Sequence, residues 1–205
     1  MKDFTYAFEN RNEKLEVYEW DNVWWEQTGK TDAPRVLYIG DSISCATRRV
    51  ATREAQNTLL FDGLGTSKAL DNPFFYDTVD LYVKQQQGRQ AVLFNNGLHG
   101  WHLDDETDYR AYYEKMILFL KSRFEGTPVI LLLTTSVADP VREARVTVRN
   151  RVVTELAQAH GLSVIDLYSV TQAHPELRTG DGVHLTADGY SLLAKVLVER
   201  VKEVL

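Results

Sequence analysis

The chain of 205 residues contains a single cysteine, Cys45, and only 5 prolines. One cysteine excludes an intramolecular disulfide framework and any zinc site built from several cysteines. Positive charge is also scarce, because the chain has 23 Lys and Arg but 29 Asp and Glu, which gives a formal net charge of −6. No basic surface is therefore expected to bind the phosphates of nucleic acids, and we expect no nucleic-acid partner.

Long apolar stretches are missing as well. No continuous apolar run is longer than Val129–Leu133, which is far too short to cross a membrane. The N-terminal segment carries Asp3, Glu9 and Arg11 where a signal peptide has its apolar core. These features predict a cytoplasmic location and no membrane partner.

Short apolar runs alternate with longer segments in which apolar residues recur every three or four positions. Runs rich in Val, Ile, Leu and Phe are typical of strands buried on both faces of a parallel sheet, and five are present: Val36–Ile39, Leu59–Phe61, Ala91–Phe94, Val129–Leu133 and Ser163–Ile165. The helical periodicity predicts helices over 105–124, 141–160 and 186–205, with weaker signals over 44–55 and 74–86. The sequence therefore predicts an α/β fold in three layers, α/β/α, with a flavodoxin-like five-stranded parallel sheet.

Residues 1–34 precede the first expected strand and are rich in aromatic side chains. Three of the four tryptophans lie here, Trp20, Trp24 and Trp25. Because each ring hides a large apolar area when it packs, we expect an arm that packs on a domain formed by residues 35–205. The alternative interpretation is that the rings form a wall of a substrate or partner site.

A Gly-Asp-Ser sequence that ends at Ser42 directly follows the first expected strand. Ligands of open α/β sheets bind beyond the carboxyl ends of the strands, and Ser42 is expected there, at the start of a helix. The N–H groups and the dipole of a helix N-terminus suit a developing oxyanion. A serine hydroxyl also needs a base within hydrogen-bonding reach, and without one Ser42 is better interpreted as a helix cap.

Such a base is offered by His184, which lies just before the last expected helix with Asp181 three residues upstream. Histidine is the usual general base at neutral pH, and a carboxylate beside it fixes its tautomer and stabilises the imidazolium. The order Ser, Asp, His along the chain is one of the known triad orders. Ser42, Asp181 and His184 are therefore a candidate catalytic triad, with a surface turn as the alternative for the last two.

These residues carry a resemblance to a known family. With Gly-Asp-Ser at Ser42 and Asp181-x-x-His184 before the last helix, the chain resembles the SGNH (GDSL-type) hydrolase superfamily over residues 35–205. Its members are mostly esterases, lipases and carbohydrate deacetylases, and some are acyltransferases. The resemblance implies Ser42 as nucleophile, His184 as base and Asp181 as the residue that orients it, without a cofactor.

The same resemblance implies an oxyanion hole made by the N–H of the serine, a glycine and an asparagine. The N–H of Ser42 is the first candidate donor. The loop after the second strand offers Gly63 and Gly65, of which we favour Gly65. The third block of the chain offers Asn96, with Asn95 as the other option. Its sequence, Asn-Asn-Gly-Leu-His, is similar to members that act on the O-acetyl groups of polysaccharides.

Other side chains near these motifs have competing interpretations. We expect His99 at the edge of the cleft and Trp101 as an apolar face for a sugar ring or acyl group, with a packed turn as the alternative. A metal held by His99 and His102 is less favoured because no further His or Cys cluster accompanies them. Cys45 is expected to be buried and inert, and Arg48 to lie in solvent with its neighbour Arg49.

The sequence thus predicts a serine esterase that removes small acyl groups, acetyl above all, from a carbohydrate or another small ester. Acyl transfer to a sugar hydroxyl by the same triad is one alternative. A non-catalytic α/β binding protein, in which both motifs are accidental, is the other.

Overall fold

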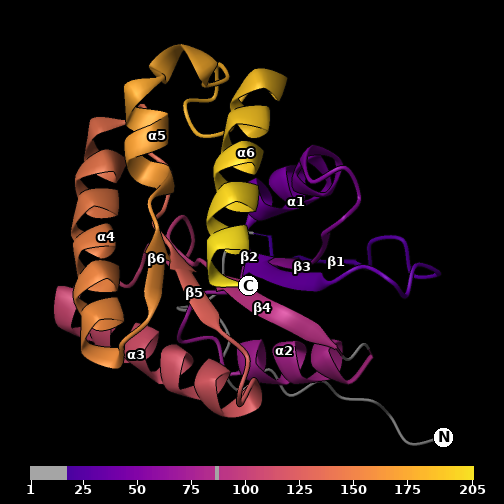
Figure 1. Cartoon of the computed structure of the whole chain (residues 1–205). Helices are drawn as coiled ribbons and strands as arrows, with labels where there is room; N and C mark the ends of the chain where they lie inside the picture. The colour runs from indigo at the N-terminus through magenta and orange to yellow at the C-terminus, as the bar shows by residue number, and fades with distance from the viewer. Residues whose placement is uncertain (1–17, 86–87) are drawn as a thin grey trace, which may run out of the picture.

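The structure is a computed structural model that describes residues 18–85 and 88–205 (Figure 1). Its centre is a six-stranded sheet with the strand order β1-β3-β2-β4-β5-β6. Five strands run parallel and correspond to the five predicted ones: β2 (Arg35–Gly40), β3 (Leu60–Thr66), β4 (Arg89–Phe94), β5 (Val129–Leu132) and β6 (Ser163–Ile165). The predicted parallel α/β sheet is confirmed.

The sixth strand, β1 (Asp21–Trp24), comes from the segment expected to be an arm. It pairs antiparallel with β3 and extends the sheet by one edge strand. Three of its four residues are exposed, so its sequence contains no apolar run that would predict a strand. The tyrosine and phenylalanine of the arm at Tyr6 and Phe8 lie outside the described residues.

Helices cover both faces of the sheet. The main helices are α1 (Ser42–Glu54), α2 (Phe74–Gln85), α3 (Glu106–Arg123), α4 (Pro140–His160) and α6 (Ala187–Val204), close to the predicted ranges. A short helix α5 (Leu167–Ala173) and a 3-10 turn (Pro175–Leu177) were not predicted, because segments of this length show little periodicity. Among the described residues, none of the helices combines the length and hydrophobicity that a membrane span requires.

The sheet separates two apolar cores. Along β2, Val36 and Tyr38 point to the core shared with α1 and α6, whereas Leu37 and Ile39 point to the core shared with α2 and α3. This two-residue alternation, with every position buried, is what a central strand covered on both faces requires. The result is the predicted three-layer α/β/α arrangement.

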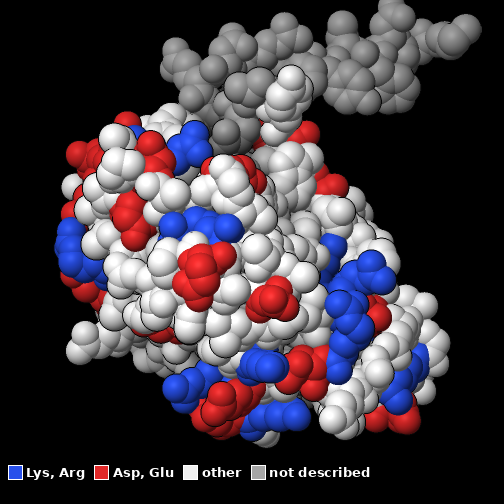
Figure 2. Space-filling model, turned by 90° about the horizontal axis from the view of Figure 1, so that it is seen from above, with Lys and Arg blue, Asp and Glu red and all other residues white. Residues whose placement is uncertain are grey.

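Charges of both signs are interspersed on the face seen in Figure 2, with no extended area of one sign. Elsewhere in the molecule, ion pairs join helices, as between Arg110 of α3 and Glu155 of α4. That face therefore offers no electrostatic footprint for a polyanion.

Candidate active site

The turn between β2 and α1 positions Ser42. Gly40 ends β2, Asp41 caps α1 by accepting a hydrogen bond from Ile43 N at 2.9 Å, and Ser42 is the first residue of the helix. A Cβ on Gly40 would lie 2.8 Å from Cβ of Ser44, so the turn needs glycine. Ser42 therefore lies at the positive end of a 13-residue helix, beyond the carboxyl end of a central strand.

The loop before α6 brings a histidine to this serine. Nε2 of His184 lies 2.9 Å from Oγ of Ser42, and Nδ1 of His184 lies 2.6 Å from Oδ2 of Asp181. With the proton on Nδ1 facing the carboxylate, Nε2 is left to accept the serine hydroxyl proton. The three residues of the candidate triad thus form one continuous hydrogen-bonded chain.

Asp181 is held by its own turn. Its Oδ1 accepts hydrogen bonds from the backbone N–H groups of Val183 and His184, both at 2.9 Å, and from the hydroxyl of Thr179 at 2.8 Å. The Val183 N–H, with the His184 side chain next, holds the pKa of the Asp181 carboxyl well below its ordinary value. The carboxylate therefore stays charged beside the imidazole.

Gly182 gives this turn its shape. It adopts the left-handed φ of 74°, which glycine enters without steric cost. Its carbonyl accepts a hydrogen bond from Ala138 N at 2.8 Å, in the loop after β5. A Cβ at this position would lie 2.8 Å from Cβ of Ala138. This contact ties the Asp181–His184 turn to the edge of the sheet where Ser42 lies.

The two asparagines after β4 have different surroundings. The amide nitrogen of Asn95 donates to Leu132 O at 2.8 Å and to Thr134 Oγ1 at 3.0 Å, so both of its hydrogens have acceptors. The amide nitrogen of Asn96 donates to Lys68 O at 2.8 Å. One hydrogen of the Asn96 amide is thus left to donate elsewhere, whereas Asn95 is committed to the core.

The two candidate glycines lie at different places along β3. Gly65 is paired in register with Gly40, and a Cβ there would lie 3.5 Å from Asp41 O and collide with Sγ of Cys45. Gly63 instead faces the Arg48 side chain, which a Cβ would strike. Gly65 therefore packs against the turn that carries Ser42, and Gly63 lies farther along α1.

His99 and Trp101 have different neighbours. The His99 ring lies edge-on to Trp20, with ring centroids 6.0 Å apart. Cζ3 of that Trp20 ring lies 3.4 Å from the position of a Cβ on Gly65, which packs against the turn that carries Ser42. The Trp101 ring faces α4, with the Arg145 guanidinium carbon 4.9 Å from its centroid. The structure thus places His99 on the Ser42 side of its loop and packs Trp101 against α4.

The sequence also led to expectations for three residues of α1. The expectation that Arg48 lies in solvent is wrong: it is 2% exposed, because β1 covers it and Asn22 accepts its hydrogen bonds. Arg49 lies over the ring of Trp24, 4.5 Å from the centroid. Cys45 is partly buried, and burial raises the pKa of its thiol.

Of two further residues in the site region, the sequence offered Trp20 only in the alternative interpretation of a wall formed by the rings of the arm, and it did not identify Arg149. Trp20 flanks Gly65 and His99, but only the pairing of its segment with β3 brings it there. Arg149 of α4 is 2% exposed and donates to the carbonyls of four residues of the loop after β4, Gly97, His99, Gly100 and Leu103. Arg149 therefore holds the loop that follows Asn96.

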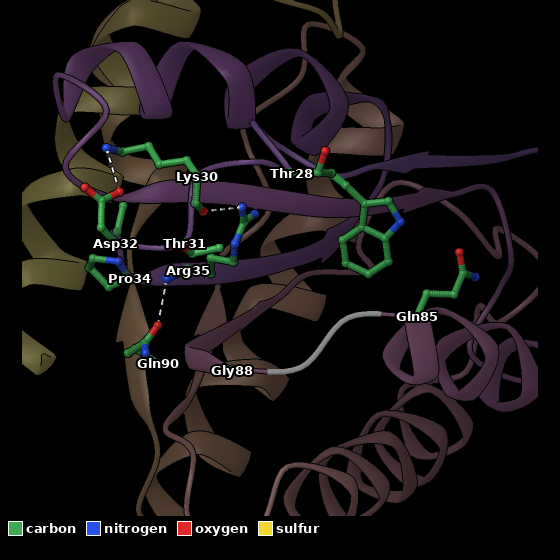
Figure 3. Close-up of a pocket in the computed structure, with 11 residues that line it drawn as sticks. Thr28, Lys30, Thr31, Asp32, Pro34, Arg35, Gln85, Gly88 and Gln90 are labelled. Carbon is green, nitrogen blue, oxygen red and sulfur yellow. Dashed lines mark hydrogen bonds and ion pairs between the residues drawn. The ribbon is translucent and has the colours of Figure 1, made fainter.

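A cavity of about 820 Å³ lies at the opposite edge of the sheet, where β2 and β4 begin (Figure 3). Its polar groups bind one another: Lys30 forms an ion pair with Asp32 at 3.0 Å, and Arg35 donates to Lys30 O at 3.2 Å. None of its lining residues belongs to the candidate triad.

The less favoured metal site at His99 and His102 finds no further ligands. His102 instead pairs with Asp71 at 3.0 Å. Within residues 18–85 and 88–205, no group of three His, Cys, Asp or Glu side chains could hold a metal ion.

Several solved structures share this fold. A lipase/acylhydrolase from Enterococcus faecalis is 20% identical, with a TM-score of 0.65, and the match covers 83% of this chain and 96% of that one. An acetylxylan esterase from Geobacillus stearothermophilus is 15% identical, with a TM-score of 0.64 and coverage of 84% and 96%. A carbohydrate esterase family 3 protein from Talaromyces cellulolyticus is 14% identical, with a TM-score of 0.64 and coverage of 83% and 97%.

No curated protein sequence matches the chain. The sequence profile of the GDSL-like Lipase/Acylhydrolase family matches residues 38–192, a span that contains Ser42, Asp181 and His184. This span is well over half of the chain. The protein therefore belongs to the GDSL-like lipase/acylhydrolase family and is a carboxylic ester hydrolase.

Proposed function

We propose that the protein is a serine esterase that hydrolyses small acyl esters, acetyl esters of carbohydrates above all, through an acyl-enzyme on Ser42. The observation that carries the proposal is the hydrogen-bonded chain from Asp181 through His184 to Ser42, with distances of 2.6 and 2.9 Å. Nucleophile, base and orienting carboxylate are thus in contact in the order that ester hydrolysis requires.

In the acylation step, Oγ of Ser42 attacks the ester carbonyl carbon while Nε2 of His184 accepts the hydroxyl proton. The carbonyl π electrons move to oxygen, and the charged Asp181 stabilises the imidazolium. His184 then gives its proton to the leaving alcohol oxygen as the carbon–oxygen ester bond breaks. The products of this step are a free alcohol and an ester on Ser42.

In the deacylation step, water takes the place of the alcohol. His184 accepts a proton from the water as its oxygen attacks the acyl carbon, and returns a proton to Oγ of Ser42 as the carboxylic acid leaves. If a sugar hydroxyl took the place of water, the same residues would transfer the acyl group, so the reaction products distinguish hydrolysis from transfer.

We assign the oxyanion hole to the N–H of Ser42, the N–H of Gly65 and the amide of Asn96. Asn96 is favoured over Asn95 because the hydrogens of the Asn95 amide are both taken up in the core. Gly65 is favoured over Gly63 because it packs against the turn that carries the serine. Each such donor contributes about 3–4 kcal/mol to stabilisation of the transition state.

A carbohydrate acetyl ester is supported by one observation. The chain shares its fold with structures described as an acetylxylan esterase and a carbohydrate esterase family 3 protein. We further propose that residues 35–205 form the hydrolase domain, on which the preceding arm packs through β1.

The test is acetate release from acetylated xylo-oligosaccharides and from p-nitrophenyl acetate. We expect wild-type protein to release acetate and Ser42→Ala to lose at least about 10³-fold in kcat. Ser191→Ala, on the partly exposed side of α6, is the matched control and should retain activity. Turnover by Ser42→Ala at the wild-type rate contradicts the proposed mechanism, and an acylated sugar formed in place of free acetate indicates transfer.

A further inference from the structure

We propose that Trp20, together with His99, forms the wall that limits the length of the acyl group, so that Trp20 is a specificity-determining residue supplied by the segment ahead of the hydrolase domain. This inference rests on the proposed function, because it concerns the acyl side of the same site.

The backbone of Trp20 is fixed to the end of β3. Trp20 N donates to Oγ of Ser67 at 2.8 Å, and Ser67 N donates to Trp20 O at 3.1 Å. On the adjacent residue, Asp21 accepts a hydrogen bond from the Thr66 hydroxyl at 2.7 Å and forms an ion pair with Lys68 at 2.5 Å. The position of the ring is therefore set by several contacts on both sides of its Cα.

The same loop supports the proposed oxyanion hole. Lys68 O accepts the hydrogen bond from the Asn96 amide at 2.8 Å, and Gly65 lies three residues before Lys68. Cζ3 of Trp20 lies 3.4 Å from the position that a Gly65 Cβ would take. The Trp20 ring thus lies directly beside Gly65. The segment that carries Trp20 is hydrogen-bonded to the loop whose Lys68 carbonyl accepts the bond from the Asn96 amide.

His99 closes the other side of this space. Its ring meets the Trp20 ring edge-on, at an interplanar angle of 78° and a centroid distance of 6.0 Å. Both side chains are partly exposed, so both rings can meet a bound ligand. Trp20 and His99 therefore form a continuous aromatic edge beside Gly65 and Asn96.

The chemistry of the intermediate directs the acyl group to this edge. The tetrahedral carbon on Oγ of Ser42 carries three other substituents: the oxyanion, the alcohol and the acyl group. The oxyanion faces the proposed donors, and the alcohol oxygen must lie near His184, which protonates it. The acyl group is left to point away from His184, toward the side of the hole bounded by Trp20 and His99. A methyl group fits there more easily than a longer chain, which must displace an indole ring.

The other tryptophans of the segment have different surroundings. Trp25 stacks on Tyr82 with centroids 4.0 Å apart, and Trp24 lies under Arg49 of α1. Trp24 is thus a matched control, because it is the same residue type four positions away in the same segment and lies over α1.

The test compares p-nitrophenyl acetate, butyrate and hexanoate, which share one leaving group and differ only in the acyl chain. We expect wild-type protein to prefer acetate. Trp20→Ala should raise the butyrate-to-acetate ratio of kcat/KM by about 10-fold or more, because one or two methylene groups in an apolar pocket discriminate on that scale. Trp20→Phe should give an intermediate ratio, and Trp24→Ala should keep the wild-type ratio.

Circular dichroism verifies that each variant is folded, and Trp20→Leu replaces Trp20→Ala if the alanine variant is not. A butyrate-to-acetate ratio that stays at the wild-type value in the folded Trp20 variants overturns this inference alone. Absence of ester hydrolysis by wild-type protein overturns the proposed function and this inference with it.

Discussion

Ser42 and His184 lie 142 positions apart in the sequence, and their side chains meet at 2.9 Å. The contact forms because β2 delivers Ser42 to the carboxyl edge of the sheet and the loop before α6 returns to that edge. Ala138, which follows β5, holds this loop in place by donating a backbone hydrogen bond to the carbonyl of Gly182. The proposed nucleophile and base are therefore joined only in the complete fold.

The carboxylate of Asp181 should be needed for the rate. In Asp181→Asn, an amide N–H group can face Nδ1 of His184 and favour the tautomer with its proton on Nε2, which cannot accept the serine proton. We expect kcat to fall by about 10⁴-fold on p-nitrophenyl acetate. Asp188→Asn, in the first turn of α6, should keep the wild-type rate, and a loss of less than tenfold in Asp181→Asn contradicts the role of Asp181.

The same carboxylate should make stability depend on pH in one direction. The pKa of Asp181 is lowered in the folded state, so its charged form stabilises the fold at pH above its unfolded pKa, and the contribution disappears as the pH falls through its folded pKa. The urea midpoint of wild type minus that of Asp181→Asn should therefore shrink as the pH falls below about 4. The exposed Glu125→Gln is the control, and a difference that grows below about pH 4 contradicts the prediction.

Alanine substitutions of the two asparagines should have different effects, one on the catalytic rate and the other on stability. Asn96→Ala should lower kcat by about 10²–10³-fold through the loss of one oxyanion donor. Asn95→Ala should instead lower the free energy of unfolding by about 1–3 kcal/mol, since it leaves buried acceptors at Leu132 and Thr134 without their donor. Ester kinetics and urea unfolding of both variants test this, and the reverse pattern would assign the hole to Asn95.

Arg149 should stabilise the loop after β4. Arg149→Met removes the donor of four carbonyl groups, and we expect the free energy of unfolding to fall by at least about 3 kcal/mol. Arg151→Met, two residues along α4 with an exposed side chain, should leave the urea midpoint nearly unchanged. Equal midpoints for the two variants contradict the role of Arg149.

The parallel sheet was predictable because its strands are buried on both faces and read as apolar runs. The strand β1 was not, because its four residues are mostly exposed and only pairing with β3 makes them a strand. The error at Arg48 has the same origin: a charged residue on α1 looks solvated until β1 covers it. The sixth strand and the burial of Arg48 both depend on pairing between segments that are distant in the sequence, and local composition does not encode such pairing.

The candidate site was likewise predictable from the sequence only in part. Ser42, Asp181 and His184 were identifiable because residue type, spacing and position relative to strands and helices all point to one chemistry. The choice between Asn95 and Asn96 depends on which neighbour each amide contacts, Leu132 across the sheet or Lys68 in another loop. Two adjacent residues of the same type carry no local signal that separates them.

The pairing of β1 with β3 has a consequence for the solution behaviour of the chain. All seven residues of β3 are buried, and without β1 this strand would present a row of unpaired N–H and C=O groups at the sheet margin. Such an edge is a template for pairing with a second molecule and for aggregation. A fragment trimmed to residues 38–192, the span that matches the family, would lack this protecting strand, so expression work is best done with residues 18–34 retained.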